Sequence, residues 1–399
     1  MGRGRRKLTL GIVEGTLLGS MCLLARSPAA AADCKLVVDP GGGGTDRTIQ
    51  AAIDRLPNPG PCVVIAKSGT YHEAVTIAGV NTLARAEEQR VVIRAESPVV
   101  VDPPGDHAFA VSGSRFVTVE GFILAGAARE AFVLAGEDQA SADIVLARND
   151  VHNNGSVAAD GGISIGAGNA GILVVNNLIR NNGRNGLSVR AGRSSGGPIH
   201  AVNNTVFGNG WNGVQIAHGA AVHLVNNLIV GNGTDRGEVG GRWGVVAQRT
   251  PGPGSPASII LTHNIFYNNG LGKPAHHGGD VGNGLRMLDP TDAGNLTTAG
   301  REGEGIAGCV FERCTGAAAF LALFEPPGFG PHFHLAAGSP AIDRGLGTFM
   351  HGGRDWVPSM DFDGDPRPQD GDLDGAPRSD VGCDEASTPA RLGARPRPR

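Results

Sequence analysis

Aromatic side chains are scarce in this chain of 399 residues, in which Phe, Tyr and Trp together make up 5%. Glycine is abundant instead, with 64 residues. The composition therefore favours many tight turns around a narrow core of Val, Ile and Leu. Collagen is excluded, because it requires Gly at every third position and the sequence lacks that period.

The sequence also lacks the motifs of several common enzyme classes. It contains no nucleotide-binding loop, no nucleophilic-serine elbow and no zinc cluster. Basic residues are not in excess, since the chain without residues 1–32 carries 29 basic and 37 acidic residues. We therefore expect no nucleic-acid partner, and an anionic polymer would need a local basic patch.

A seven-residue motif recurs in the middle of the chain: Asn, any residue, an apolar residue, any residue, Asn or Gly, then Asn-Gly. Its copies begin at Asn149, Asn177, Asn204, Asn227 and Asn264, and a weaker copy begins at Gly121. Successive copies start 28, 28, 27, 23 and 37 residues apart. Such periods indicate a supersecondary unit stacked on copies of itself. The β-rich stretches around each Asn predict three strands and three turns per repeat, which is one coil of a right-handed parallel β-helix.

The positions five and three residues before each Asn are apolar throughout. They are Ile144/Leu146, Ile172/Val174, Ile199/Ala201, Val222/Leu224 and Ile259/Leu261. Their period of two predicts that they point inward and form the stacked core. The Asn side chains recur at a turn, where they can bond one another from coil to coil, so we assign them a structural rather than a catalytic role.

Both ends of the chain differ from the repeats. Residues 1–32 have basic residues, an apolar run and a small-residue cleavage site, which predicts a signal peptide, a secreted or cell-surface protein and no membrane span after cleavage. We divide the rest into residues 33–115 (N-terminal cap and first coils), 116–290 (repeat coils), 291–385 (closing segment) and 386–399 (disordered basic tail). We expect a monomer.

Five cysteines remain after cleavage, as suits an oxidising compartment. Cys34 with Cys62 and Cys309 with Cys314 are the expected disulfides, although the sequence alone leaves the pairing open. Cys383 is then left over as a small buried apolar residue.

Two stretches carry a family resemblance. The helical spacing of TIQAAIDRLP predicts a cap over the first coil. Together with the turn Gly69–Glu73, it resembles the N-terminal region of pectin methylesterases and pectate-lyase-like β-helix proteins, where such residues serve architecture. The runs FHLAAGSPAIDRG, DFDGDPRP and SDVGCDE resemble the last segment of secreted bacterial β-helix proteins. The resemblance implies the pectate-lyase-like fold. However, the two Asp and one Gln of the methylesterases and the His motif of mannuronan epimerases are absent.

A column across the coils suggests a binding groove. We align the strands after the variable loops on Ile163, Leu187, Val214, Val245 and Leu285. The residues three positions earlier are Asp160, Arg184, Trp211, Arg242 and Gly282, and neighbouring outward positions add Arg190, Gln215, Gln248 and His218. An indole for a sugar ring and guanidinium groups for carboxylates suit an acidic polysaccharide. Solvated loop residues would show the same composition.

The column also suggests chemistry. In a β-eliminating lyase, Arg184 or Arg242 could take the proton next to a uronate carboxylate. Asp160 could bind calcium, but no second carboxylate aligns with it. We therefore predict an exported polysaccharide-binding or -processing protein, lyase-like if it is an enzyme. The alternative is a non-catalytic structural or adhesive β-helix protein of the cell surface or matrix.

Two further groups could bind metals. Asp370, Asp372 and Asp374 copy the start of a calcium-binding loop, although its twelfth position, normally Glu, is Val381. A solvated turn explains them as well. His200 and His223 share one outward column, and we expect them to be exposed strand residues rather than metal ligands.

Overall fold

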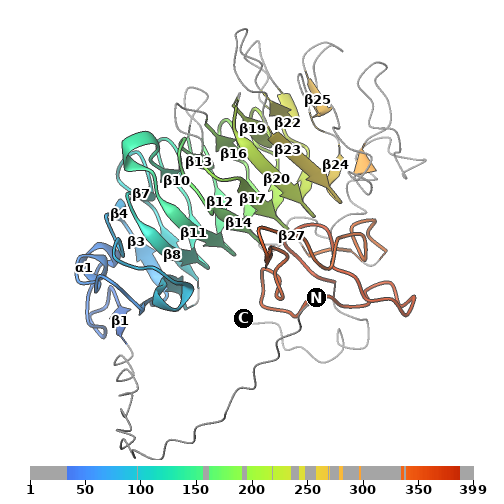
Figure 1. Ribbon diagram of the computed structural model, residues 1–399. Coiled ribbons are helices and arrows are strands. Elements are labelled where there is room, and N and C mark those ends of the chain that lie inside the picture. The colour runs from blue at the N-terminus through green and yellow to red at the C-terminus, as the bar shows by residue number, and fades with distance from the viewer. Residues whose placement is uncertain are drawn as a thin grey trace, which may run out of the picture. The chain divides into compact units, whose positions relative to one another are not determined.

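The computed structural model describes residues 34–96, 98–155, 161–190, 196–217, 219–234, 242–247, 258–267, 269, 278–281, 296–297, 334–336 and 338–386. All of them belong to one compact unit, Cys34–Arg399. Three parallel β-sheets form the body of this unit (Figure 1).

Each sheet takes one strand from every coil. Sheet I consists of β1 (Lys35–Val38), β2 (Cys62–Ala66), β5 (Val91–Ala95), β8 (Arg115–Glu120), β11 (Ala142–Ala147), β14 (Leu173–Val175), β17 (Ile199–Val202), β20 (Ala221–Val225) and β23 (Ser258–Thr262). Sheet II consists of β3 (Gly69–Tyr71), β6 (Val99–Val101), β9 (Ile123–Leu124), β12 (Asp150–His152), β15 (Leu178–Arg180), β18 (Thr205–Phe207), β21 (Leu228–Val230), β24 (Ile265–Tyr267) and β26 (Leu296–Thr297). Sheet III consists of β4 (Val75–Ala78), β7 (Phe109–Ser112), β10 (Phe132–Leu134), β13 (Ile163–Ile165), β16 (Leu187–Val189), β19 (Val214–Ile216), β22 (Arg242–Ala247) and β25 (Gly278–Val281).

The chain passes through sheets I, II and III in turn and then starts the next coil. This is the predicted right-handed parallel β-helix, with three strands in each repeat. The register follows the sequence repeat: Val174 pairs with Ala201, which pairs with Leu224. The predicted fold class is therefore confirmed.

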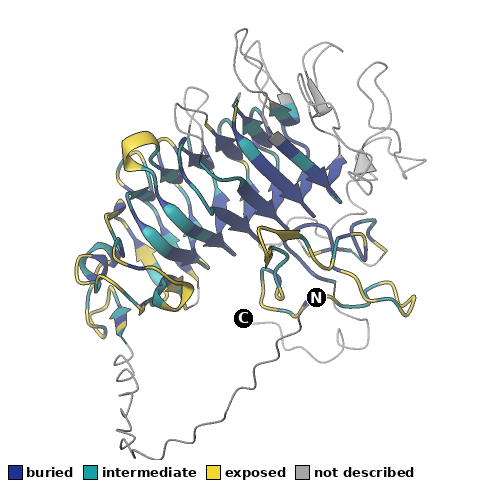
Figure 2. Ribbon diagram, viewed as in Figure 1, coloured by how far each residue is buried: buried dark blue, intermediate teal, exposed yellow. Residues whose placement is uncertain are grey.

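The inward column is buried as predicted. Ile144, Leu146, Ile172 and Val174 are 0% exposed, and Ile259, at the far end, is 7% exposed. Figure 2 shows that the middle strands are the most deeply buried part of the solenoid. Each aliphatic residue stacks on its equivalent in the next coil, which gives one continuous core.

Asparagines form two ladders along the helix. The first, at the predicted turn between sheets I and II, joins Asn149, Asn177, Asn204, Asn227 and Asn264 through side-chain hydrogen bonds of 2.9 to 3.1 Å. The second uses the Asn before the Gly of each repeat, at the turn between sheets II and III: Asn154, Asn182, Asn209, Asn232 and Asn269. The repeated motif thus encodes two stacked turns rather than one.

The N-terminal coils include α1 (Ile49–Ile53), within the stretch predicted to be helical. Thr48 caps this helix, and the Glu73 carboxylate accepts hydrogen bonds from the backbone N–H groups of Ile49 and Gln50. Glu73 is therefore architectural, as expected. The helix is only five residues long, and its capping of the solenoid stays a prediction.

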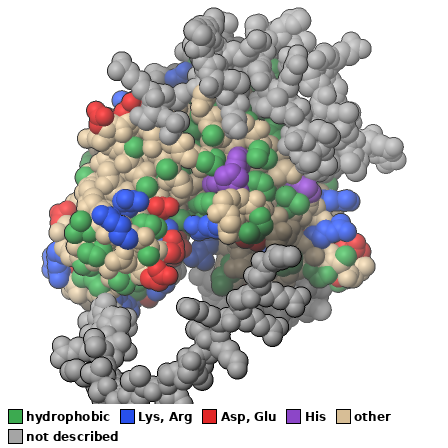
Figure 3. Space-filling view, viewed as in Figure 1, with side chains coloured by type: hydrophobic (Ala, Val, Ile, Leu, Met, Phe, Trp, Pro, Cys, Tyr) green, Lys and Arg blue, Asp and Glu red, His purple; other side chains and the backbone are tan. Residues whose placement is uncertain are grey.

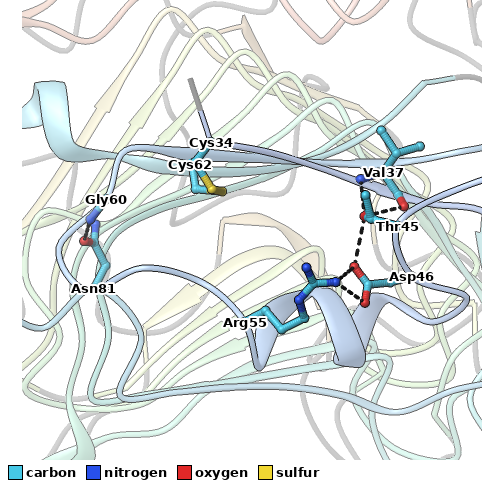
Figure 4. The surroundings of a disulfide bond; sticks show 8 residues. All are labelled: Cys34, Val37, Thr45, Asp46, Arg55, Gly60, Cys62 and Asn81. Atoms are coloured by element: carbon cyan, nitrogen blue, oxygen red, sulfur yellow. Dashed lines mark hydrogen bonds and ion pairs between the residues drawn. A yellow bond between two sulfur atoms is a disulfide. The ribbon is translucent and has the colours of Figure 1, made fainter. Parts of the chain in front are cut away.

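The disulfide between Cys34 and Cys62 is confirmed (Figure 4). It lies at the start of the paired strands β1 and β2, and an Arg55–Asp46 ion pair lies nearby. Cys383 is a free, buried thiol, as predicted. Cys309 and Cys314 lie outside the described residues.

Residues 334–386 of the closing segment form loops around a short antiparallel pair, β27 (Met350–His351) and β28 (Arg354–Asp355). This segment contacts the coils directly: the Asn203 side chain donates to the Asp380 carbonyl at 2.9 Å, and Asn226 donates to the Leu346 carbonyl at 2.9 Å. Two short 3-10 turns, η1 (Glu87–Gln89) and η2 (Glu137–Gln139), complete the described elements.

Candidate functional site

The strand alignment behind the predicted column on sheet III is confirmed for its first four strands. Ile163 pairs with Leu187, which pairs with Val214, which pairs with Val245. The fifth alignment is wrong, because Val245 pairs with Val281 rather than Leu285. Gly282 therefore leaves the column, since the loop before β25 is shorter than the alignment assumed.

Arg184 and Trp211 lie together on adjacent coils, as predicted. The Arg184 guanidinium carbon lies 3.8 Å from the centre of the indole ring, so one face of the ring is already occupied by a cation. A sugar would have to use the opposite face. Asp160, His218 and Gln248 lie outside the described residues, as does the side chain of Arg242.

Gln215 has a structural role that the sequence did not reveal. Its side-chain oxygen accepts hydrogen bonds from Asn185 at 3.1 Å and from Asn212 at 3.3 Å. Asn185 and Asn212 themselves form a third, short ladder. Gln215 is half-buried and bonded within the protein, so its side-chain oxygen is less available to a ligand than predicted.

A hollow of about 230 Å³ opens on sheet III, closer to the N-terminus than the predicted groove. Its polar lining comes from four coils: His107 before β7, Arg129 and Glu130 before β10, Ser164 on β13, and Arg190 after β16. Arg129 extends the predicted column, because it lies three residues before Phe132, which is aligned with Ile163.

Glu130 is the central residue of this hollow. Its side chain is 2% exposed, yet it carries a carboxylate among cationic side chains. Arg190 donates to Oε1 at 3.1 Å and to the Ser164 hydroxyl at 3.1 Å, which links three coils. The Arg129 Nε lies 3.6 Å from Oε2. The arrangement holds a buried negative charge beside half-exposed positive ones.

The second carboxylate oxygen of Glu130 has a different environment. Oε2 is buried and has no hydrogen-bond partner among the described residues. His107 lies 3.4 Å away, but its Nδ1 is closer to the Glu130 backbone oxygen, at 3.1 Å. Buried carboxylate oxygens are normally satisfied, and an exception calls for an explanation such as a catalytic role or a bound group.

Close backbone packing shapes the hollow. A Cβ atom on Gly166 would lie 2.5 Å from the backbone nitrogen of Gly136, so both positions require glycine. Glu130 and His107 were not predicted as site residues, because the copy of the Asn-Gly motif that begins at Gly121 is weak and no copy precedes it. Extending the strand alignment to Phe109 and Phe132 would have placed both residues two positions before an inward side chain.

In the closing segment, two of the three predicted calcium ligands come together with a third carboxylate that was not predicted. Asp370 and Asp372 lie beside Asp343, with one oxygen atom from each within 4.8 Å of the others. Asp374 is not part of this group, and its Oδ1 accepts from the Ala376 backbone N–H. Val381, at the twelfth position of the loop, is 1% exposed and packs in the apolar interior.

Figure 3 shows one face of the molecule, where charged side chains gather mainly over the N-terminal coils, at the lower left of the view. Hydrophobic and uncharged polar groups cover most of the middle. Among the described residues, no helix is long and apolar enough to cross a membrane.

Comparisons with known proteins found two kinds of solved structure and one family model. The crystal structure of pectate lyase Pel9A matches with 14% identity and a TM-score of 0.42, covering 90% of this chain and 98% of that one. The periplasmic alginate epimerase AlgG matches with 15% identity and a TM-score of 0.32, covering 56% of this chain and 57% of that one. At these values, neither similarity bears on activity. No curated protein matches. The family model described as "Right handed beta helix region" matches residues 100–243, which is about a third of the chain, and its description agrees with the fold of those residues.

Proposed function

We propose that this chain is an exported β-helix protein that binds acidic polysaccharide along sheet III and cleaves it by a lyase-like reaction. The observation that supports the proposal best is the unsatisfied Oε2 of buried Glu130, placed between Arg129 and Arg190. Buried acids beside specific charged partners in a concave site are typical of catalytic groups.

The reaction needs two kinds of group. A base removes the proton next to the uronate carboxylate, the bond from the ring to the bridging oxygen breaks, and a C=C double bond forms in the ring, while the departing oxygen takes a proton from water. Cations stabilise the negative charge that develops on the carboxylate. Arg129 and Arg190, which are 51% and 53% exposed, would bind the carboxylate, and Glu130 would accept the proton.

Glu130 suits the role of base better than Arg184 does. The Arg184 guanidinium is held 3.8 Å from the indole ring of Trp211, so it is committed to this stacking contact. Arg242 is the alternative base, Asp160 is proposed as a calcium ligand, and His218 and Gln248 are proposed to contact the ligand. Trp211 would bind a sugar ring on the face opposite Arg184.

The test uses purified protein with polyuronates, alginate and sulfated glycans, following the ultraviolet absorbance of the unsaturated product. Glu130→Gln keeps the shape of the side chain, and we expect it to lower the rate by about 100-fold or more. Arg190→Lys should raise KM, because it removes planar guanidinium contacts. Arg94→Lys, an exposed arginine on β5 in sheet I, is the matched control. Full activity of Glu130→Gln would exclude Glu130 as the base.

One observation favours the non-catalytic alternative. Arg190 is bonded to Glu130, and Arg184 is stacked on Trp211, so both cations already have partners within the solenoid. A rigid surface protein would show the same internal pairing. Under this alternative, polyuronate binds but no product forms. Trp211→Ala should weaken the binding while it changes the melting temperature little.

A further inference from the structure

Three histidines from distant parts of the chain meet on the outer face of sheet I. His200 on β17 pairs directly with His223 on β20, and His351 on β27 of the closing segment lies against both. One ring nitrogen from each of the three lies within 4.8 Å of the others. The prediction that His200 and His223 are exposed strand residues is wrong, because the closing segment covers them.

Burial makes these imidazoles unusual. His200 is 1% exposed and His223 is 4% exposed. The Nδ1 atom of each is buried and has no hydrogen-bond partner among the described residues. Buried polar atoms are normally bonded, so two unsatisfied ring nitrogens in successive coils indicate a missing partner.

The three rings already have the spacing of a metal centre. Their centroids are 4.8 Å apart for His200 and His223, 5.3 Å for His200 and His351, and 4.5 Å for His223 and His351. Three imidazoles that bind one tetrahedral Zn²⁺ through nitrogens at about 2.1 Å place their ring centres about 5 Å apart. An ion at that distance requires nitrogens about 3.4 Å apart, so the rings must turn to bring together nitrogens that now lie within 4.8 Å of one another.

Burial favours the neutral form of His200 and His223, which is the form that binds a metal. Burial, and then the positive charges that His223, His351 and Arg354 can carry, lower the pKa of His200 to about 3. Burial and His351 lower the pKa of His223 to about 4. Trp356 stacks on His200 at 3.7 Å with an interplanar angle of 8°, which fixes the orientation of that ring.

We propose that His200, His223 and His351 bind a Zn²⁺ ion that fastens the closing segment to sheet I. Imidazole nitrogens select zinc over calcium or magnesium, which prefer oxygen ligands. Phe349 packs beside the two strand histidines, with its ring centre 6.4 Å from that of His200 and 5.6 Å from that of His223. Three protein ligands leave a fourth position open for a water molecule.

The experiment uses the full chain, purified with a tag that contains no histidine and stripped of metal with a chelator. Calorimetric titration with Zn²⁺ should show a site that His351→Gln weakens at least about tenfold. His72→Gln, a 70% exposed histidine outside the cluster, is the matched control and should bind as the unmodified chain does. His351 is exposed, so its substitution should leave the metal-free fold intact.

A second readout separates a metal site from simple packing of three rings. Co²⁺ bound to the cluster should give the visible absorption of a tetrahedral centre, and Zn²⁺ should displace it. Zn²⁺ should also raise the melting temperature of the unmodified chain but not that of His351→Gln. Equal zinc affinity of the unmodified chain and the His351→Gln variant would overturn the proposal, and so would zinc titrations without any binding.

Discussion

At the scale of single residues, the ladder asparagines use most of their hydrogen-bonding capacity. The Asn204 side-chain nitrogen donates to the Asn227 side chain at 3.0 Å and to the Val174 carbonyl at 2.8 Å. Its oxygen accepts from the backbone and side chain of Asn177, at 2.9 and 3.0 Å. Every group is buried, so each bond replaces hydration that folding removed.

Asn204→Ala should therefore lower the free energy of unfolding by about 1–3 kcal/mol, because it leaves polar groups unpaired on both neighbouring coils. Chemical denaturation measures the change. A control position must lie outside the hydrogen-bonded asparagine ladders, which excludes Gln215, because it bonds Asn185 and Asn212. Thr76→Ala, at an exposed position on β4, should cost less than about 0.5 kcal/mol. Equal costs for the two variants would contradict the energetic role of the ladder.

At the scale of elements, the closing segment is built around buried carboxylates. The Asp343 carboxylate accepts from the backbone N–H groups of Gly371, Asp372 and Arg378. Burial raises the pKa of Asp361 to about 6. Arg367 and Glu385 form an ion pair of 3.0 Å in which both side chains are almost fully buried. These contacts hold the loops in place without regular secondary structure.

Calcium binding was predicted at Asp370, Asp372 and Asp374 and is untested, and the group that lies together has Asp343 in place of Asp374. If the ion binds there, adding calcium should raise the melting temperature, and a calcium-selective chelator should reverse the effect. Asp370→Asn combined with Asp372→Asn should abolish this response. Asp374→Asn should preserve it, because Asp374 lies outside the group. A melting temperature that does not respond to calcium would leave only a solvated turn.

At the scale of the whole molecule, the closing segment covers the outer face of sheet I, where His200 and His223 are buried. Because burial lowers their folded-state pKa values to about 3 and 4, below about 6.5 in the unfolded chain, the neutral imidazoles contribute stability above pH 6.5. That contribution is lost as the pH falls towards 4. His351 and Arg354 add to the effect by opposing protonation of His200. Asp361, whose pKa is raised, acts in the opposite direction.

The difference between two proteins isolates the histidine contribution. Between pH 7 and pH 5, the metal-free chain should lose on the order of 4 kcal/mol more stability than the His200→Gln, His223→Gln double variant, about 2 kcal/mol for each imidazole. Urea denaturation at the two pH values, with a chelator present, measures both losses. Identical losses would show that the imidazoles are accessible to protons in the folded chain.

The sequence determined the features that repeat with the coil. The core positions, the first ladder and the order of strands all depend on contacts between neighbouring coils. In a solenoid each coil packs only on the next, so a local pattern specifies the structure wherever it recurs.

Only the tertiary structure decided which side chains meet outside this pattern. Glu130 and Arg190 are 60 residues apart and belong to different coils. His351 reaches His200 from a segment without any repeat, and Val281 rather than Leu285 continues the column after Val245. Loop lengths vary from coil to coil, so no period in the sequence specifies which loop residues come close together. Arg129, Glu130 and Arg190 lie just outside the strands, where the stacking pattern does not specify the residue.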